Sequence, residues 1–384
     1  MDALMLLFAI AVIIGVVVVP ALRRRRERQE LERAAAAADT LTGSGQGPRP
    51  GHVSFDKDPG GASADLPPEY AGGLVPSAQL DIRLPGPDDE LIAALEETQR
   101  TQNWRPVGQL LALTDEPELR WQRVQSLGGA ASVELGTHRA TGEGTDAGWL
   151  RMWRTQEPAD PGGSEVYAQF LVWQALRDTE TAEHRIILEE ARTVCGEAAR
   201  LAPDDVVPGI VELYIARGLG YSRQEFDALW SRITARAPQH MGAHVAAISY
   251  LSEKWHGSRA EAEGFGRTAA GGAGQGSLLP ALPLFAVYDH LPEMQHSPGM
   301  FQGAVIRDAI EAAQFALNTA RDDHPMAPHV RHLLLWFLVR AERYPEAVEQ
   351  MRAVDGYVGA IPWVTDGDPV RYYTAFRALA IARQ

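Results

Sequence analysis

The chain has 384 residues, which is long enough for one large domain or two of ordinary size. Its 36 Lys and Arg residues against 50 Asp and Glu residues give a net charge of −14. This acidic balance argues against a general nucleic-acid binder, which needs a basic footprint to displace counterions from phosphates. The one cysteine, Cys195, excludes an intrachain disulfide and a zinc site built on several thiolates.

The first expected element is a membrane-spanning helix. Residues from Ala3 to Leu22 are apolar throughout, interrupted only by Gly15 and Pro20, and about twenty helical residues span the roughly 30 Å of a bilayer core. A secretory signal peptide carries positive charge before a shorter apolar core, whereas the basic residues here follow it. The sequence therefore predicts a transmembrane helix over residues 1–22, beginning at Ala3. The positive-inside rule then places the N-terminus outside and the body in the cytoplasm of a single-pass cell-membrane protein.

The cluster Arg23, Arg24, Arg25 and Arg26 has two interpretations. It is a stop-transfer flank of the membrane helix, or it also contacts anionic lipids, as basic clusters beside membrane helices do. Acidic residues at positions 27, 30 and 32 dilute the cluster and favour the first interpretation. Residues 23–40, which include a run of five alanines, are expected to continue the helix beyond the membrane.

A linker is expected over residues 41–87. Gly and Pro make up 17 of its 47 residues, and no apolar period is present. Such a segment cannot bury enough apolar surface to offset its ordering entropy, so the composition predicts a disordered tether. As a flexible coil it would hold a domain about 40 Å from its anchor.

The body, residues 88–384, is predicted to be all-α. Apolar residues recur with the helical period, for example in the stripe formed by Phe226, Leu229, Trp230 and Ile233. Residues 333–339 are apolar at seven consecutive positions, which indicates a helix enclosed on all sides. Two further stripes consist of Ile187, Leu188, Ala191, Val194, Cys195 and Ala198, and of Ile306, Ile310, Ala313 and Leu317.

Helix boundaries carry capping signals. Ser222 with Glu225, and Ser258 with Glu261, have the spacing of a capping box. Gly257 is expected to end the preceding helix in a left-handed conformation. These signals delimit roughly a dozen helices, and residues 133–148 are left open between a loop and a short hairpin. Two more helix starts are predicted by prolines at the first helical position, in Asp368-Pro369 and at Pro345.

Two helical pairs have the spacing of a repeat. Pro203 and Pro238 each stand between helices and lie 35 residues apart, close to the tetratricopeptide period of about 34. The segment 328–354 forms a similar unit. Tyr214 and Leu335 stand where consensus repeats have small residues. The body is therefore predicted to be a solenoid of tetratricopeptide-like helical hairpins rather than of consensus repeats.

The stretch Lys254-Trp255-His256-Gly257-Ser258, followed by Glu261 and Phe265, is the most specific of several similar stretches. The others are Asn103-Trp104, Gln109–Leu111, Trp149–Trp153, Ala198–Asp205 and Arg236–His244. Together they resemble a family of bacterial proteins known only as a domain of unknown function with tetratricopeptide-like helices, over about Asp88 to Ala270. The family usually has a small residue where His256 stands. The resemblance implies a helical fold and transfers no functional residue.

Recognisable catalytic motifs are missing from the sequence. Neither lysine follows a glycine, so there is no Walker A loop, and no GxSxG, HExxH or CxxC occurs. No cofactor and no metal are expected. Cys195 lies on an apolar stripe and is interpreted as a small core residue rather than a nucleophile.

The histidines are interpreted as structural. His240 and His244 are four residues apart and could face one metal ion, but a zinc site needs a further ligand. His324, His329 and His332 are expected to be solvent-facing residues of a loop and a helix start.

The tryptophans suggest where a partner could bind. Trp173, Trp230 and Trp336 are expected in the core, because they stand on apolar stripes. Trp255 stands in a turn with Gly257 and Ser258, where it either plugs neighbouring hairpins or contacts a partner. Trp363 is a candidate for the lining of a groove. The candidate partner-contact or turn residues are therefore Trp255, Gly257, Ser258 and Trp363.

Three functions remain open from the sequence. The first is a membrane-anchored cytosolic helical-repeat scaffold or adaptor, whose acidic body favours a protein partner with basic segments. The second is an enzyme, such as a hydrolase that uses the 324–332 region, with no recognisable motif. The third is a structural subunit of a membrane complex, in which the segment Ala3–Leu22 itself makes contacts.

Overall fold

The computed structural model describes residues 73–177, 179, 181–291, 299–365 and 368–384. These residues form fifteen α-helices, α3 to α17, and no strand, so the all-α prediction is confirmed for this part of the chain. Among the same residues no helix is long and apolar enough to cross a membrane. The predicted membrane helix, its extension over 23–40 and the arginines at 23–26 lie outside the described residues and stay predictions.

The helices follow one another with short connections. Their bounds are α3 Asp89–Thr101, α4 Arg105–Ala112, α5 Pro117–Thr141, α6 Gly148–Gln156, α7 Pro161–Leu176, α8 Ala182–Leu201, α9 Val207–Leu219, α10 Arg223–Arg236, α11 Met241–Leu251, α12 Arg259–Gly271, α13 Leu282–Asp289, α14 Ala304–Thr319, α15 Ala327–Arg340, α16 Tyr344–Ala353 and α17 Pro369–Arg383. Short 3-10 helices occupy Ser77–Gln79, Leu279–Ala281, Met300–Gln302 and Trp363–Thr365.

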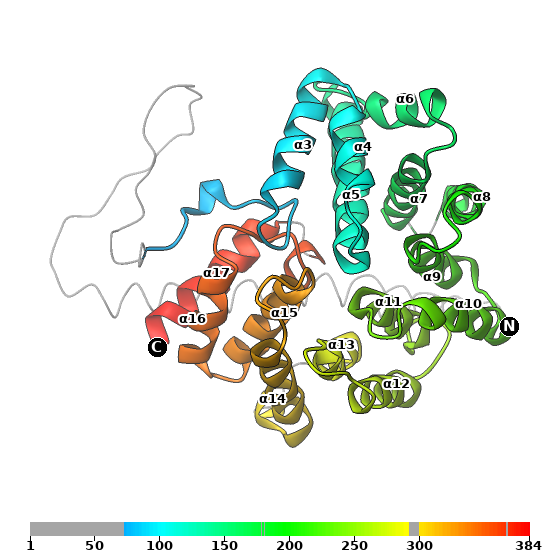
Figure 1. Cartoon of the computed structure of the whole chain (residues 1–384). Coiled ribbons are helices and arrows are strands. Elements are labelled where there is room, and N and C mark those ends of the chain that lie inside the picture. The colour runs from blue at the N-terminus through cyan, green and yellow to red at the C-terminus, as the bar shows by residue number, and fades with distance from the viewer. Residues whose placement is uncertain (1–72, 178, 180, 292–298, 366–367) are drawn as a thin grey trace, which may run out of the picture.

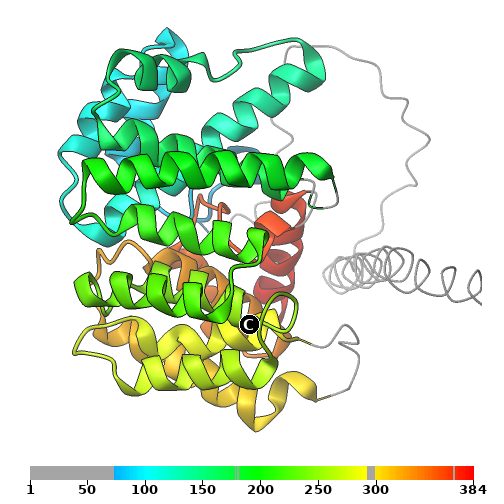
Figure 2. The same ribbon diagram turned by 90° about the vertical axis from the view of Figure 1, so that its right-hand side faces the viewer.

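The helices stack in two layers (Figure 1). In the inner row α5, α7, α9, α11, α13, α15 and α17 follow each other, and each packs against the next. Helices α8, α10, α12, α14 and α16 lie between them in the chain and pack on the outside (Figure 2). The row curves, since α5 contacts α9 and α11 as well as α7. One continuous hydrophobic core runs from α3 to α17 between the layers.

The predicted stripes form this core. Phe226, Leu229 and Ile233 of α10 are buried, and so is every residue from 333 to 339 in α15. Trp336 is buried as predicted, whereas Trp173 and Trp230 are only half-buried. The 3.6-residue period therefore located the core faces correctly, but it did not give the depth of each tryptophan.

The capping predictions hold at Ser222, where the full capping box with Glu225 is present, and at Asp368, which accepts from the backbone of the first helical turn. The prediction for Gly257 is wrong, because its φ is not positive. Glycine is required there for another reason. A Cβ at this position would collide with the carbonyl oxygen of Leu251, so the turn closes only around a residue without a side chain.

Residues 133–148, left open in the sequence, are mostly helical. Helix α5 continues to Thr141 and ends at Gly142, which has a φ of 71°. The side chain of Glu134 organises the loop that follows. Its carboxylate accepts from the indole of Trp149 and the backbone of Ala147, and also from the hydroxyl of Thr145. A hairpin is thereby excluded in favour of a long helix and a loop held by one acidic side chain.

The prediction of a disordered linker over 41–87 is wrong for residues 74–86, and its part up to residue 72 lies outside the described residues. Residues 74–86, here called the strap, lie against the C-terminal helices. Leu80 and Leu84 are buried, and Asp81 exchanges backbone hydrogen bonds of 2.8 Å with residues 356 and 358. The average composition of the 47 residues did not reveal that two leucines at the end of the segment could be buried. Their burial against residues far along the chain offsets the cost of ordering the strap.

Candidate functional site

Trp363 does not line a groove. Its side chain is fully buried, with 0% exposure, among the aromatic rings of α17. Its indole nitrogen donates to Nδ1 of His332 at 3.0 Å. The sequence prediction for Trp363 is therefore wrong, because His332 and the aromatic rings of α17 enclose a position that looks like an exposed loop in the local sequence.

His332 is buried with it, which contradicts the expectation of a solvent-facing residue. Because Nδ1 accepts from Trp363, Nε2 carries the hydrogen and donates to the carbonyl of Pro85 in the strap at 2.8 Å. Burial lowers the pKa of His332 to about 3, so the ring is neutral. His324 and His329 are half-buried. This histidine thus joins the strap to the core.

Trp255 lies in the turn between α11 and α12 and is half-buried. The turn is held by backbone hydrogen bonds from Trp255 and Gly257 to the carbonyl of Ser252. Next to it, Nε2 of His256 lies 2.7 Å from the carbonyl oxygen of Arg217 at the end of α9. The turn is therefore docked on α9, which belongs to the preceding pair of helices.

The two small residues of this turn have structural roles. Gly257 permits the close approach to Leu251, and Ser258 is the N-cap of α12, where its side chain accepts from the backbone of Glu261. Neither contributes a side chain free for ligand contact, so of the predicted turn residues Trp255 alone offers an accessible recognition surface.

Arg217 stacks against this tryptophan. Its guanidinium carbon is 4.7 Å from the ring centre of Trp255 and 5.4 Å from that of Tyr214. Both distances are within cation–π range. The Nε atom of Arg217 is buried without a hydrogen-bond partner, and no carboxylate among the described residues forms a salt bridge with it. Desolvation lowers the pKa of Arg217, more than nearby groups raise it.

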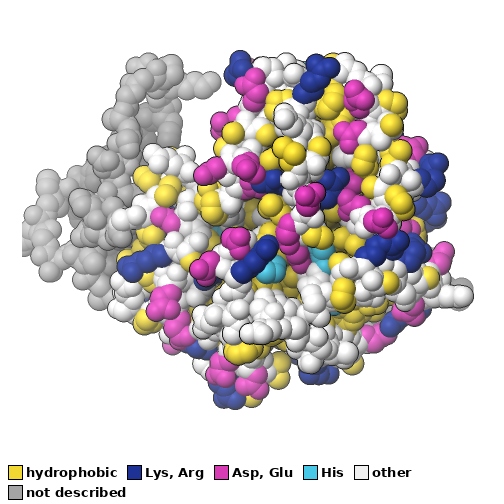
Figure 3. Space-filling view, viewed as in Figure 1, with side chains coloured by type: hydrophobic (Ala, Val, Ile, Leu, Met, Phe, Trp, Pro, Cys, Tyr) yellow, Lys and Arg dark blue, Asp and Glu magenta, His cyan; other side chains and the backbone are white. Residues whose placement is uncertain are grey.

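Charged residues of both signs flank the arginine. Lys254 lies 5.8 Å from the ring centre of Trp255. Asp289, at the end of α13, raises the pKa of Arg217 electrostatically without pairing with it, and burial of the carboxyl group raises the pKa of Asp289 itself. Figure 3 shows acidic and basic side chains interspersed over the surface in that view rather than gathered by sign. The face seen in that view therefore carries no large patch of a single sign.

His240 and His244 are committed to the fold. Nδ1 of His240 caps α11 by accepting from Ala243 at 3.1 Å, and its Nε2 faces the carbonyl of Pro117 at 3.3 Å. Nδ1 of His244 lies 2.9 Å from the carbonyl of His240. Within the described residues no group of three or more His, Cys, Asp or Glu is arranged to hold a metal ion.

Glu118 lies beside this pair, at the contact between α5 and α11. Its Oε1 is 3.3 Å from Nδ1 of His240 and accepts from the backbone of Met241. Burial raises the pKa of Glu118 to about 8, so the carboxyl is mostly protonated at neutral pH. The cluster joins helices 123 residues apart in the chain, which gives it a structural role.

Cys195 is a core residue, as predicted. It is buried, its thiol donates to the carbonyl of Pro208, and burial raises its pKa well above the usual value. A thiol in this state is a poor nucleophile.

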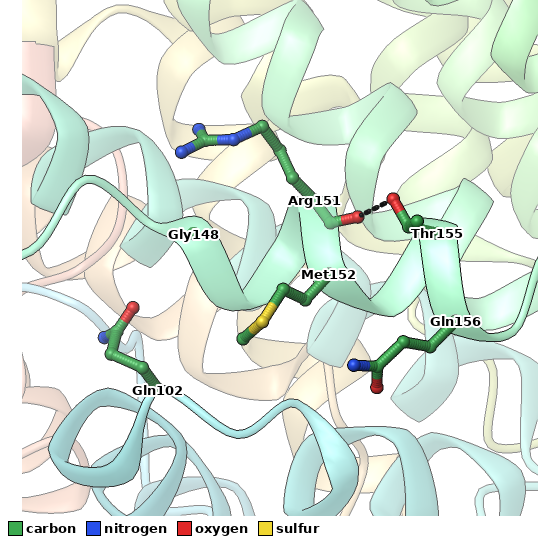
Figure 4. A pocket seen from close by; sticks show the side chains of 6 residues that line it. All are labelled: Gln102, Gly148, Arg151, Met152, Thr155 and Gln156. Atoms are coloured by element: carbon green, nitrogen blue, oxygen red, sulfur yellow. Dashed lines mark hydrogen bonds between the residues drawn. The ribbon is translucent and has the colours of Figure 1, made fainter.

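A shallow pocket of about 380 Å³ opens between the end of α3 and α6 (Figure 4). Most of its polar groups are committed to the fold. The amide oxygen of Gln156 accepts from Trp104, the amide of Gln102 donates to Glu134, and Arg151 pairs with Asp146. The pocket offers few free groups for recognition, and we assign no ligand to it.

Comparisons of the chain with protein-family models, with curated proteins and with solved structures gave no match. The resemblance to a tetratricopeptide-like family stays a prediction.

Sequence reasoning found Trp255 but missed Arg217 and Asp289. In the sequence, Arg217 looks like an ordinary basic residue in the last turn of a helix, a position that the helix dipole favours, so nothing marked it as a site residue. The 35-residue spacing between Pro203 and Pro238 could have pointed to Arg217. Counting 35 residues on from Arg217 leads to Ser252, at the start of the turn that contains Trp255. The spacing of the repeat thus indicates which turns become neighbours.

Proposed function

We propose that the protein is a scaffold or adaptor, built as a tetratricopeptide-like helical solenoid, that is anchored in the cell membrane through residues 3–22 and binds a protein partner in the cytoplasm. The two-layered stack of helices supports this proposal, since such stacks offer extended surfaces for other chains. The anchor rests on the apolar segment and the arginines that follow it.

The observation that carries the proposal is the Trp255 turn. Trp255 packs on an arginine that has no carboxylate partner, where the C-terminal ends of α9, α11 and α13 meet. A tryptophan and an arginine together are typical of an interaction hot spot rather than of a core. The net charge of −14 over the whole chain further favours a partner that carries basic segments beyond this contact.

The test is affinity capture of the full-length protein from native membranes solubilised in mild detergent. The wild type is compared with Trp255→Ala and with Val305→Ser, which changes an exposed apolar residue of α14. We expect one protein to co-purify stoichiometrically with the wild type and with Val305→Ser, and to be lost with Trp255→Ala. Absence of a stoichiometric partner in all three preparations refutes the scaffold function.

The anchor is tested separately. Alkaline extraction should leave the full-length protein in the membrane pellet, whereas a chain that begins at Gly73 should be released to the supernatant. External protease should leave the body intact in sealed spheroplasts if it lies in the cytoplasm. Release of the full-length chain by alkali, or digestion of the body from outside, contradicts the proposed topology.

A further inference from the structure

The feature that the scaffold function leaves unexplained is the state of Arg217. An arginine that is partly withdrawn from water normally pairs with a carboxylate, because an unpaired buried charge is costly. Here two aromatic rings supply part of the compensation, and Nε has no hydrogen-bond partner. Nε is itself buried and out of a partner's reach, but the two terminal nitrogens form no hydrogen bond with the described residues and are not buried. The guanidinium therefore has unused donor capacity beside an accessible tryptophan.

The charged groups around Arg217 limit which ligands can accept hydrogen bonds from its guanidinium. Lys254 adds a second positive charge 5.8 Å from the ring centre of Trp255, while Glu253 and Asp289 add negative charge nearby. Asp289 comes from α13 and stays outside salt-bridge range of Arg217. His290, next to it, is engaged by the backbone amide of Glu253 at 3.3 Å and by the carbonyl of Ala286 at 2.8 Å. It adds no free donor.

We propose that Arg217 and Trp255 form a binding site for a single carboxylate, which an Asp or Glu side chain of the partner protein presents. This inference rests on the proposed scaffold function and names the chemistry of the contact. The other members of the site are Tyr214, which supports the guanidinium, Lys254 and Asp289.

The choice of a carboxylate follows from shape and charge. The planar guanidinium fork matches a carboxylate in a bidentate arrangement, and stacking on the rings fixes its plane beforehand. A phosphate carries about twice the charge at neutral pH, and Asp289 would repel it more strongly. Asp289 thus acts as a selectivity element that tolerates one negative charge and disfavours two.

The choice of a protein segment follows from the openness of the site. The residues come from the ends of α9 and α13 and from the turn after α11, and none of them lines the pocket of Figure 4. Small molecules are usually held in enclosed clefts, whereas an extended chain suits an open row of helix ends. The ring of Trp255 then packs against an apolar residue next to the bound carboxylate.

The experiment measures the fluorescence anisotropy of labelled peptides with the full-length protein in detergent. The probes are a pool of nonapeptides with a central Glu and varied apolar flanks, the same pool with Gln, and the same pool with phosphoserine. We expect the Glu pool to bind about tenfold or more tightly than the Gln pool, as a charge-assisted contact requires. The phosphoserine pool should bind more weakly than the Glu pool.

Two variants with opposite expected effects on peptide binding test the roles of Arg217 and Asp289 separately. Arg217→Gln should weaken binding of the Glu pool about tenfold and abolish its advantage over the Gln pool. Asp289→Asn should tighten binding, because the repulsion is removed. Arg105→Gln is the matched control, since Arg105 also lies over a tryptophan, at 5.8 Å, but elsewhere on the surface. It should leave binding unchanged.

Equal binding of the Glu and Gln pools, or no binding at millimolar peptide, overturns the proposal. Preferred binding of phosphoserine overturns the choice of carboxylate, and so does weaker binding by Asp289→Asn. Failure here is distinguishable from failure of the scaffold function. If the captured partner depends on Trp255 but is retained by Arg217→Gln, the carboxylate site alone is refuted.

Discussion

Two tryptophans in similar sequence contexts have opposite surroundings. Trp255 and Trp363 both stand in short segments between α-helices, and both are candidates for partner contact from the sequence. Trp363 is enclosed by α17 and His332, whereas Trp255 is half-buried and carries an arginine on its ring. The difference arises from tertiary packing, because His332 of α15 and the rings of α17 enclose Trp363, and nothing comparable among the described residues encloses Trp255.

Removing the strap should have the largest effect on the stability of the protein. A chain that begins at Asp88, the boundary expected from composition, should be several kcal/mol less stable than one that begins at Gly73, because each buried leucine contributes about 1.5–3 kcal/mol. Urea unfolding of both chains, followed by far-UV circular dichroism, measures the difference. Equal unfolding midpoints would show that the strap does not stabilise the C-terminal helices.

Trp363→Ala should destabilise the protein by about 3–5 kcal/mol, the usual cost of deleting a buried large aromatic side chain. It also leaves Nδ1 of His332 without its donor. Trp363→Phe keeps most of the volume and should cost less. The measurement is again the free energy of unfolding in urea. A loss below about 1 kcal/mol for Trp363→Ala would mean that the residue is not in the core.

Glu118 gives a pH dependence with a defined sign. Its pKa rises from about 4.5 in the unfolded chain to about 8 in the folded protein. The folded state therefore binds the extra proton, and this stabilisation is complete below pH 4.5 and is lost as the pH rises through 8. Removing the ionisable group in Glu118→Gln should abolish that loss, so the variant gains on the wild type by about 1 kcal/mol or more between pH 6 and pH 9.

Unfolding measurements of both proteins at several pH values test this expectation. The buried histidines act in the opposite direction at lower pH. Burial lowers the pKa of His240 from 6.5 to about 4, so its contribution to stability is complete above pH 6.5 and is lost as the pH falls towards 4. Parallel pH profiles of the wild type and Glu118→Gln above pH 6 would refute the protonated state of Glu118.

Trp255→Ala should have the smallest effect on stability, about 1 kcal/mol, because the ring is half-buried and its main contact is one arginine. The same change should abolish partner capture. A variant that unfolds as readily as Trp363→Ala would place Trp255 in the core and remove it as a contact residue.

The sequence located the helices because their signals are local. The periodic stripe of α10 and the capping box at Ser222 each depend on residues within a few positions. The strap was beyond such reasoning, since Leu80 and Leu84 become buried only against residues about 275 positions later. Gly257 was identified as a necessary glycine but for the wrong conformation, because its constraint is contact with Leu251 rather than a positive φ.

The candidate site was predictable in part for the same reason. Trp255 could be selected as a tryptophan in a turn, but Arg217 is one of 34 arginines and Asp289 one of many acidic residues. Only the stacking of α9, α11 and α13 brings them together. The burial of Trp363 likewise depends on packing against His332 and α17.

Site-specific photocross-linking in native membranes tests the central claim most directly. A photoreactive phenylalanine analogue replaces Trp255 in the full-length protein, and in a control it replaces Phe315, which is 60% exposed on α14. We predict one discrete cross-linked protein at position 255 that is lost when Arg217→Gln is added, and none at position 315. No adduct at 255, or the same adducts at both positions, would contradict the account.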